Sequence, residues 1–336
     1  MSCSNKFHIL EIQDLSISFR QYEKGIRQVD LPVISRLNVT VHEGEIVAVV
    51  GSSGSGKSLL AHAILGLLPS NAMCSGEFFF LQEPLTPERM EKLRGKEIAL
   101  VPQSVTYLDP LMKVGKQVRR GRRDRETVSR QRELFSQYGL AQEVEEKYPF
   151  ACSGGMSRRI LLATALMENP RLIIADEPTT ALDVTVQAQV LELLQGLQDE
   201  LNTSILLITH NLGVVWKMCD TVMVMYAGKT VEYADTKTLY AQPMHPYTWG
   251  LLDSIPKLSD KVKGELKTIP GVPPDLRLTG KCCNFYNRCP YAQEICSKEV
   301  PELAELEPGH FVACHRQNGE KKTGERRGES QWMKRK

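Results

Sequence analysis

The sequence predicts an α/β protein with a largely parallel central sheet, and three observations carry this prediction. The apolar runs RLIIADE and SILLITH are separated by a helical stretch over residues 184–201, as parallel strands joined by a crossover helix are. A third apolar run, EIVAVV, leads through a glycine-rich loop into an apolar helical pattern over residues 58–68, which stops before Pro69. The three runs therefore indicate buried strands of one sheet.

The segments around these runs predict other structure. Residues 9–50 begin with two short alternating strands, ILEIQDLSISF and VISRLNVTV, and the turn HEGE precedes EIVAVV, so we expect an antiparallel β region. Residues 110–149 are helical and polar, which predicts an insertion outside the core. The run TVMVMYAGKTVEYAD predicts a closing hairpin with its turn at the Ala-Gly pair.

The composition is that of an ordinary globular protein. Of 336 residues 42% are hydrophobic, and 42 basic side chains against 40 acidic ones leave a net charge of only +2, which points to no polyanionic partner. No run of about eighteen apolar residues is present, so we expect a chain that stays in the cytoplasm. After Tyr240 prolines and cysteines become dense, and the polar residues 317–336 predict a disordered tail.

A phosphate-binding loop is predicted between the EIVAVV strand and the helix that follows it. Glycines let backbone N–H groups approach phosphate oxygens at the helix N-terminus. Lys57 supplies a positive charge to the outer phosphates, and the Ser58 hydroxyl is a ligand for Mg²⁺. The loop consists of Gly51, Ser52, Ser53, Gly54, Ser55, Gly56, Lys57 and Ser58.

Two adjacent carboxylates end the RLIIADE run, at the carboxyl end of a strand, where doubly wound sheets bind their ligands. We expect Asp176 to hold Mg²⁺ and Glu177 to orient the attacking water as general base. Taken alone, two acids that cap the next helix are the alternative. His210, at the end of SILLITH, is a candidate contact to the γ-phosphate.

The tetrapeptide Ser-Gly-Gly-Met, which opens a helix before the Asp176 strand, resembles the signature of ATP-binding-cassette (ABC) proteins. The resemblance implies that ATP is held between the phosphate loop of one cassette and the signature of another, so that sites form only in a dimer. It assigns Gln103 to the loop that contacts Mg²⁺ and the membrane subunits, and His210 to the switch histidine. The other residues implied at the nucleotide are Phe19, Leu59, Ser153, Gly154, Gly155 and Asp183.

Phe19 stands where the family places an adenine-stacking ring, although an aromatic residue in a strand is more often part of a core. Asp183 belongs to the sequence Ala-Leu-Asp, which resembles the loop that crosses the dimer interface. Two residues depart from the signature pattern, since Cys152 replaces a leucine and Arg158 replaces a glutamine.

The chain is similar up to about His315 to the ATPases of peptide and nickel importers, particularly to the first of their two paired ATPase subunits. The sequence His-Pro-Tyr-Thr at residues 245–248 and the later cysteines resemble the C-terminal extension of that branch. The resemblance implies a phosphate-loop cassette at residues 1–240 with a helical subdomain at about 105–165, and the extension at 241–316.

The same resemblance implies an ATPase that binds ATP and Mg²⁺ and energises the import of peptides or chelated nickel. Its implied partners are a second homologous ATPase, most readily in a heterodimer, two transmembrane permease subunits and an extracytoplasmic substrate-binding protein. The chain is expected on the cytoplasmic side of the membrane as a peripheral subunit, and no nucleic-acid partner is expected.

The cysteine series of the extension is spaced more widely than the paired ligands of most structural zinc sites. Four thiolates suit an iron–sulfur cluster, which some relatives in the peptide branch carry, while zinc and free thiols are the alternatives. The cysteines concerned are Cys283, Cys289, Cys296 and Cys314.

Other functions remain as alternatives. The arginine-rich residues 119–125 lack interleaved aromatic side chains, so a solvated helix face is favoured over a surface for nucleic acid or acidic lipid. A cassette ATPase that acts on DNA or ribosomes needs a second cassette, a coiled-coil insertion or a zinc hook, and the sequence reveals none of them. A redox-sensing regulator built on the cysteines is the third alternative.

Overall fold

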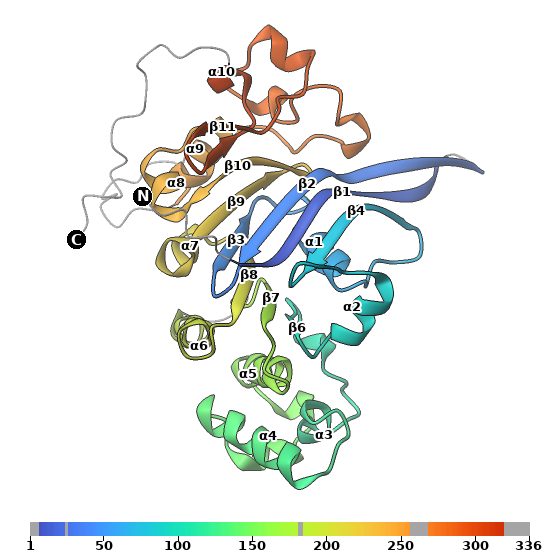
Figure 1. Ribbon diagram of the computed structural model, residues 1–336, viewed down its shortest axis with the longest axis vertical. Helices are drawn as coiled ribbons and strands as arrows, with labels where there is room; N and C mark the ends of the chain where they lie inside the picture. The colour runs from blue at the N-terminus through green and yellow to red at the C-terminus, as the bar shows by residue number, and fades with distance from the viewer. Residues whose placement is uncertain (1–6, 24–25, 181–183, 256–267, 319–336) are drawn as a thin grey trace.

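A mixed eight-stranded sheet forms the centre of the protein (Figure 1). The computed structural model describes residues 7–23, 26–180, 184–255 and 268–318. Five neighbouring strands run parallel and three antiparallel strands extend the sheet at one edge. In order across the sheet the strands are β11 (Ala304–Glu307), β12 (His310–Val312), β10 (Lys229–Asp235), β9 (Thr221–Tyr226), β3 (Ile46–Val50), β8 (Ser204–Thr209), β7 (Leu172–Asp176) and β6 (Ile98–Val101).

The parallel strands are apolar because both faces of the sheet are covered. Every residue of β3, β7, β8 and β9 is buried. Alternate residues of one strand enter two separate cores, as Ile173 and Ile174 of β7 do. The predicted parallel arrangement of RLIIADE and SILLITH is confirmed, with Ile173 opposite Ile205.

An antiparallel sheet packs against the central one and confirms the predicted β region (Figure 1). Its strands are longer than the sequence pattern suggests, because β1 and β2 form a hairpin that continues past the apolar runs. In order across this sheet the strands are β2 (Arg27–His42), β1 (His8–Glu23), β4 (Ala72–Phe80) and β5 (Glu83–Pro84).

The α-helices cover the central sheet and build the peripheral parts of the chain. Helix α6 has the predicted bounds, and α3, α4 and α5 lie at one end of the molecule, below the sheet in Figure 1. The described α-helices are α1 (Lys57–Ile64), α2 (Pro87–Leu93), α3 (Val114–Val118), α4 (Arg125–Gln137), α5 (Gly154–Leu166), α6 (Val184–Leu201), α7 (Leu212–Met218), α8 (Thr236–Ala241), α9 (Pro246–Asp253) and α10 (His315–Asn318).

The prediction that the first helix reaches residue 68 is wrong, because α1 ends at Ile64. Gly66 has a φ of +64°, in the left-handed region that glycine adopts readily. Its N–H donates to the Ala63 carbonyl and the Leu67 N–H donates to the His62 carbonyl, which are the two bonds of a Schellman motif. The glycine therefore ends the helix before the proline does.

The C-terminal part of the chain packs on the antiparallel edge of the sheet (Figure 1). Strand β12 pairs with β10, and the buried His310 of β12 contacts the buried Glu232 of β10, with Nε2 and Oε1 2.8 Å apart. The short helix α10 ends at Asn318, and residues 319–336 of the predicted tail lie outside the described residues. No helix in the described part of the chain is long and apolar enough to span a bilayer.

Candidate nucleotide site

The phosphate loop runs from the carboxyl end of β3 to the start of α1, and two of its glycines are required by close contacts. A Cβ atom on Gly51 would lie 2.2 Å from the backbone oxygen of Met225. On Gly56, whose φ is +98°, it would lie 2.9 Å from Cγ1 of Ile34. Because the loop lies directly against β9 and β2, no larger residue fits at either position.

The Lys57 side chain folds back over the loop that precedes it. Its Nζ donates to the backbone oxygens of Gly51 at 2.8 Å and Ser52 at 2.9 Å. An ammonium group has three donors, so one remains for a phosphate oxygen. Burial lowers the pKa of Lys57, while the carboxylates of Glu177 and Asp176 act in the opposite direction. The loop therefore presents a positive charge that burial has partly stripped of water.

Asp176 ends β7 beside the first turn of α1 and has the surroundings of a cation ligand. It is 6% exposed, and Ser58 is hydrogen-bonded to its carboxylate. Burial raises the pKa of Asp176, and the Ser58 hydroxyl opposes that rise. The Oδ1 atom is buried without a hydrogen-bond partner among the described residues. An orphaned carboxylate oxygen beside a hydroxyl fits Mg²⁺, which prefers oxygen ligands.

Glu177 stands at the centre of a hydrogen-bond network formed by three separate segments. Gln103 Nε2 donates to Oε2 at 3.3 Å, and the Thr180 hydroxyl donates to the same oxygen at 2.7 Å. His210 Nδ1 lies 3.1 Å from Oε1. Gln103, predicted to contact Mg²⁺, and His210, predicted to contact the γ-phosphate, therefore meet at the carboxylate of Glu177, the predicted base.

The backbone conformation of Glu177 is fixed, and the hydrogen bonds to its side chain favour the ionised carboxylate. Its φ is +46°, which is unusual for a residue with a side chain and costs on the order of 1 kcal/mol. Its N–H is fixed by the Ile208 carbonyl at 2.8 Å. Burial by itself would raise the pKa of Glu177, but the hydrogen bonds from Thr180 and His210 outweigh it and hold the pKa below its ordinary value. The carboxylate is therefore ionised at neutral pH.

The predicted signature begins α5, which lies apart from α1 (Figure 1). The Ser153 side chain caps the helix by accepting from the Met156 N–H at 3.3 Å. Ser153 and Gly154 are exposed, and a Cβ on Gly154 would meet nothing within 4 Å. An open helix N-terminus of this kind suits phosphate oxygens supplied from outside the chain.

Arg158, one of the two departures from the signature pattern, points into the protein and contacts the predicted glutamine loop. It is 3% exposed, and its guanidinium donates to the backbone oxygens of Pro102 at 2.5 Å and Gln103 at 2.6 Å. The arginine therefore ties the signature helix to the segment that carries Gln103. Cys152 is partly buried and packs against the larger core.

The remaining predicted nucleotide contacts are less defined. Phe19 is partly buried against the core beneath the antiparallel sheet, which agrees with the alternative that it is a core residue. Leu59 packs on the same core from α1. Asp183 lies outside the described residues, together with Ala181 and Leu182.

The four cysteines of the extension come near one another without forming a metal centre. Burial raises the pKa of Cys283 to about 12, and the thiols of Cys296, Cys314 and Cys289 add to the rise. Within the ranges that the structure describes, no group of three or more His, Cys, Asp or Glu side chains is arranged to hold a metal ion. The thiol chemistry suits a soft metal, but this arrangement does not.

Three arginines of the arginine-rich stretch are held by contacts within the chain. Arg119 lies 3.4 Å from Glu145, and Arg122 pairs with Glu168. Arg120 donates to the Gly95 carbonyl at 2.5 Å. Residues 119–124 lie between α3 and α4, so the prediction that this stretch is a helix face is wrong.

Two contacts at the site were not predicted. The Thr180 hydroxyl donates to the Glu177 carboxylate. A hydroxyl residue three positions after a carboxylate is the sequence feature from which this contact could have been predicted. The Tyr247 hydroxyl accepts from the Ser52 N–H at 2.8 Å across 195 residues of sequence, and no local pattern announces such a contact.

The sequence matches known families and proteins that are described as transporter ATPases or their parts. Residues 34–180 match the family described as ABC transporter, and residues 231–296 match the C-terminal region of oligopeptide/dipeptide transporters. The oligopeptide transport ATP-binding protein OppD of Salmonella typhimurium is 42% identical over 318 residues, which cover 91% of this chain and 93% of the relative. The dipeptide transport ATP-binding protein DppD of Lactococcus lactis is 40% identical over 318 residues, 90% of this chain and 89% of the relative.

Solved structures support the same conclusion. The protein cbiO1 of Clostridium perfringens, part of the ABC transporter complex cbiONQ, superposes with a TM-score of 0.58 at 26% identity over 70% of this chain and 91% of that one. A dimeric ATP-binding cassette in a post-hydrolysis state, bound to ADP and Pi, gives a TM-score of 0.58 at 26% identity over 68% and 98%. The phosphate loop, the carboxylate network and these matches place the chain in the family of ATP-binding proteins of ABC transporters.

Proposed function

We propose that this chain hydrolyses ATP to energise the import of oligopeptides or dipeptides, as the names of its relatives indicate for those proteins. The observation that supports hydrolysis most directly is the position of the Glu177 carboxylate, which is held by Gln103, Thr180 and His210. Nickel import, the other cargo of the branch, has no support from a relative's name. The match of residues 231–296 to the oligopeptide/dipeptide transporter C-terminal region favours a transporter over a DNA, ribosome or redox function.

The residues divide the reaction between them. The loop N–H groups and Lys57 bind the phosphates of ATP, and Glu177 takes the proton of the attacking water. His210 and Gln103 fix the direction of that carboxylate. Ser58, Asp176 and Gln103 would hold Mg²⁺, which when bound neutralises charge on the phosphates.

The sites are completed by a second cassette. The exposed signature residues Ser153 and Gly154, together with Gly155 and Asp183, would contact the ATP bound by the partner. We propose a heterodimer with a homologous ATPase, because Arg158 makes this signature unlike the common one and two different ATPases tolerate unequal sites.

Two permease subunits and an extracytoplasmic substrate-binding protein complete the proposed complex, with this chain peripheral on the cytoplasmic side. Exposed apolar side chains soon after Gln103 and just before the signature support a permease contact, since exposed apolar groups can mark interaction surfaces. Tyr107 is 59% exposed, Phe150 78% and Leu111 87%.

Deletion of the gene tests the proposed cargo. We expect cells without this chain to lose growth on peptides as the source of an essential amino acid, and to respond to nickel limitation as before. The wild-type gene should restore growth and the Glu177→Gln variant should not. Unchanged peptide uptake in the deletion strain would overturn the proposal.

We also propose that the four-cysteine group binds a soft metal centre, with an iron–sulfur cluster first and zinc second. The electrostatic interaction of the Cys283 thiol with those of Cys289, Cys296 and Cys314 supports this. Protein purified without oxygen should contain iron and absorb near 400 nm. Zinc without that absorbance would select the second candidate, and protein free of both metals would leave only free thiols.

A further inference from the structure

The C-terminal extension contacts the phosphate loop through one side chain. Tyr247, in the first turn of α9, is fully buried, and its hydroxyl accepts the N–H of Ser52, the second residue of the loop. The Ser52 side chain interacts with the same hydroxyl. Lys57 donates to the Ser52 carbonyl, so both the N–H and the C=O group of this loop residue are hydrogen-bonded to side chains.

The position of the Tyr247 ring is fixed by two other aromatic rings. Its centroid lies 4.6 Å from that of Tyr226 in β9 and 5.4 Å from that of Phe285 in the cysteine-containing part of the extension. Phe285 and Tyr226 are themselves 5.2 Å apart, edge to face. We call these three residues the aromatic cluster. Three rings in mutual contact leave the hydroxyl little freedom to leave Ser52.

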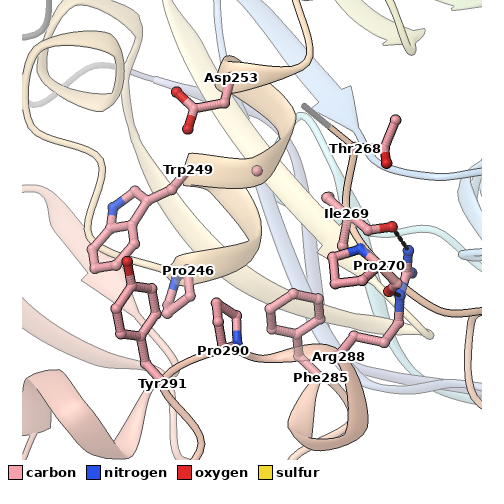
Figure 2. Close-up of a pocket in the computed structure, with 11 residues that line it drawn as sticks. Pro246, Trp249, Asp253, Thr268, Ile269, Pro270, Phe285, Arg288, Pro290 and Tyr291 are labelled. Atoms are coloured by element: carbon pink, nitrogen blue, oxygen red, sulfur yellow. Dashed lines mark hydrogen bonds between the residues drawn. The ribbon is translucent and has the colours of Figure 1, made fainter. Parts of the chain in front are cut away.

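The surrounding polar contacts hold the aromatic cluster in place. Arg288 donates to the Tyr226 hydroxyl at 3.2 Å and to the backbone oxygens of Ile269 at 3.1 Å and Pro270 at 2.8 Å. Figure 2 shows Phe285 and Arg288 side by side at the wall of a pocket of about 280 Å³, which Pro246 and Trp249 of α9 also line.

Helix α9 is in turn attached to the central sheet. The His245 side chain accepts from the Tyr247 N–H at 3.0 Å, and the His245 N–H donates to the buried Glu232 of β10 at 2.9 Å. The hydroxyl of Tyr247 is therefore positioned by the sheet, by α9 and by the extension at once.

We propose that Tyr247 is a positioning residue for ATP binding, through which the C-terminal extension holds the phosphate loop in its binding conformation. A loop that is already ordered loses less conformational freedom when phosphate binds, so the affinity for ATP is higher. The proposal rests on the proposed role of the loop in binding ATP. It adds a contribution from a part of the chain that lies outside the cassette match at residues 34–180.

The test is a comparison of two tyrosine variants in the assembled transporter complex. Tyr247→Phe removes the hydroxyl at Ser52 and keeps the ring. Tyr240→Phe is the matched control, because that buried hydroxyl also bonds to the backbone, at Leu212, away from the loop. We expect Tyr247→Phe to raise the KM for ATP about 3- to 10-fold, as the loss of one net hydrogen bond predicts, with kcat within about 2-fold.

Tyr240→Phe should leave the KM unchanged. It should lower the thermal unfolding midpoint about as much as Tyr247→Phe does, since each variant loses one buried hydrogen bond. Phe285→Leu, which loosens the aromatic cluster and spares the hydroxyl, should raise the KM in the same direction. An unchanged or lower KM in Tyr247→Phe, or an equal rise in Tyr240→Phe, would overturn the proposal. A wild-type complex that hydrolyses no ATP would instead contradict the proposed function.

Discussion

The Glu177→Gln variant is expected to bind ATP as the wild type does and to hydrolyse it about 10²- to 10⁴-fold more slowly. Glutamine has nearly the same shape, so Gln103, Thr180 and His210 still surround it. A neutral amide cannot accept the proton of the attacking water, and loss of a positioned general base costs a factor of this size. Phosphate release under saturating ATP measures the rate, and equilibrium binding of ATP measures the affinity.

The control for this variant is Glu168→Gln, which removes a carboxylate that pairs with Arg122 at the helical end of the molecule. It should retain wild-type turnover, because Glu168 pairs with Arg122 and no contact joins it to the described residues of the nucleotide site. Equal turnover in Glu177→Gln and wild type would refute the assignment of the base. Loss of ATP binding in Glu177→Gln would show instead that the carboxylate holds the loop together.

The parts of the site that lie close together in sequence were predictable. A strand, a glycine loop and a helix follow one another without a gap, so the pattern of apolar residues and glycines predicts the position of Lys57. Asp176 and Glu177 were predictable for the same reason, because an apolar strand points its carboxyl end at the ligand edge of a parallel sheet. Local order in the sequence therefore carried most of the fold and the chemistry.

The contacts that join distant segments were not predictable. From the sequence, Arg158 is only a departure from the signature pattern. The packing of α5 on the segment at Pro102 shows that its side chain holds the glutamine loop. From the sequence, Tyr247 is only part of a motif that resembles the C-terminal extension of the family. The structure shows that its hydroxyl contacts the phosphate loop. Hydrogen bonds between segments depend on how helices pack, and a single sequence contains no periodic signal for that.

The Lys57→Ala variant is expected to lose about 10- to 100-fold in ATP affinity, because a hydrogen bond to a charged partner contributes about 1.5–3 kcal/mol. Lys92→Ala, which removes an exposed lysine from α2, is the control and should bind ATP normally. Equilibrium titration with ATP measures both. Wild-type affinity in Lys57→Ala would mean that the loop is not the phosphate site.

The same variant should lose binding without a matching loss of stability. Burial lowers the pKa of Lys57, so its charge is disfavoured in the folded protein without nucleotide, and the nearby carboxylates only partly compensate. A residue held at a binding site for function can often be removed at little cost to stability or even with a gain, in contrast to an apolar core side chain. We therefore expect the thermal unfolding midpoint of Lys57→Ala to stay at or above that of the wild type without nucleotide. At one ATP concentration, ATP should raise the midpoint of the wild type more than that of Lys57→Ala, because the stabilisation grows with the affinity of the folded state for the ligand.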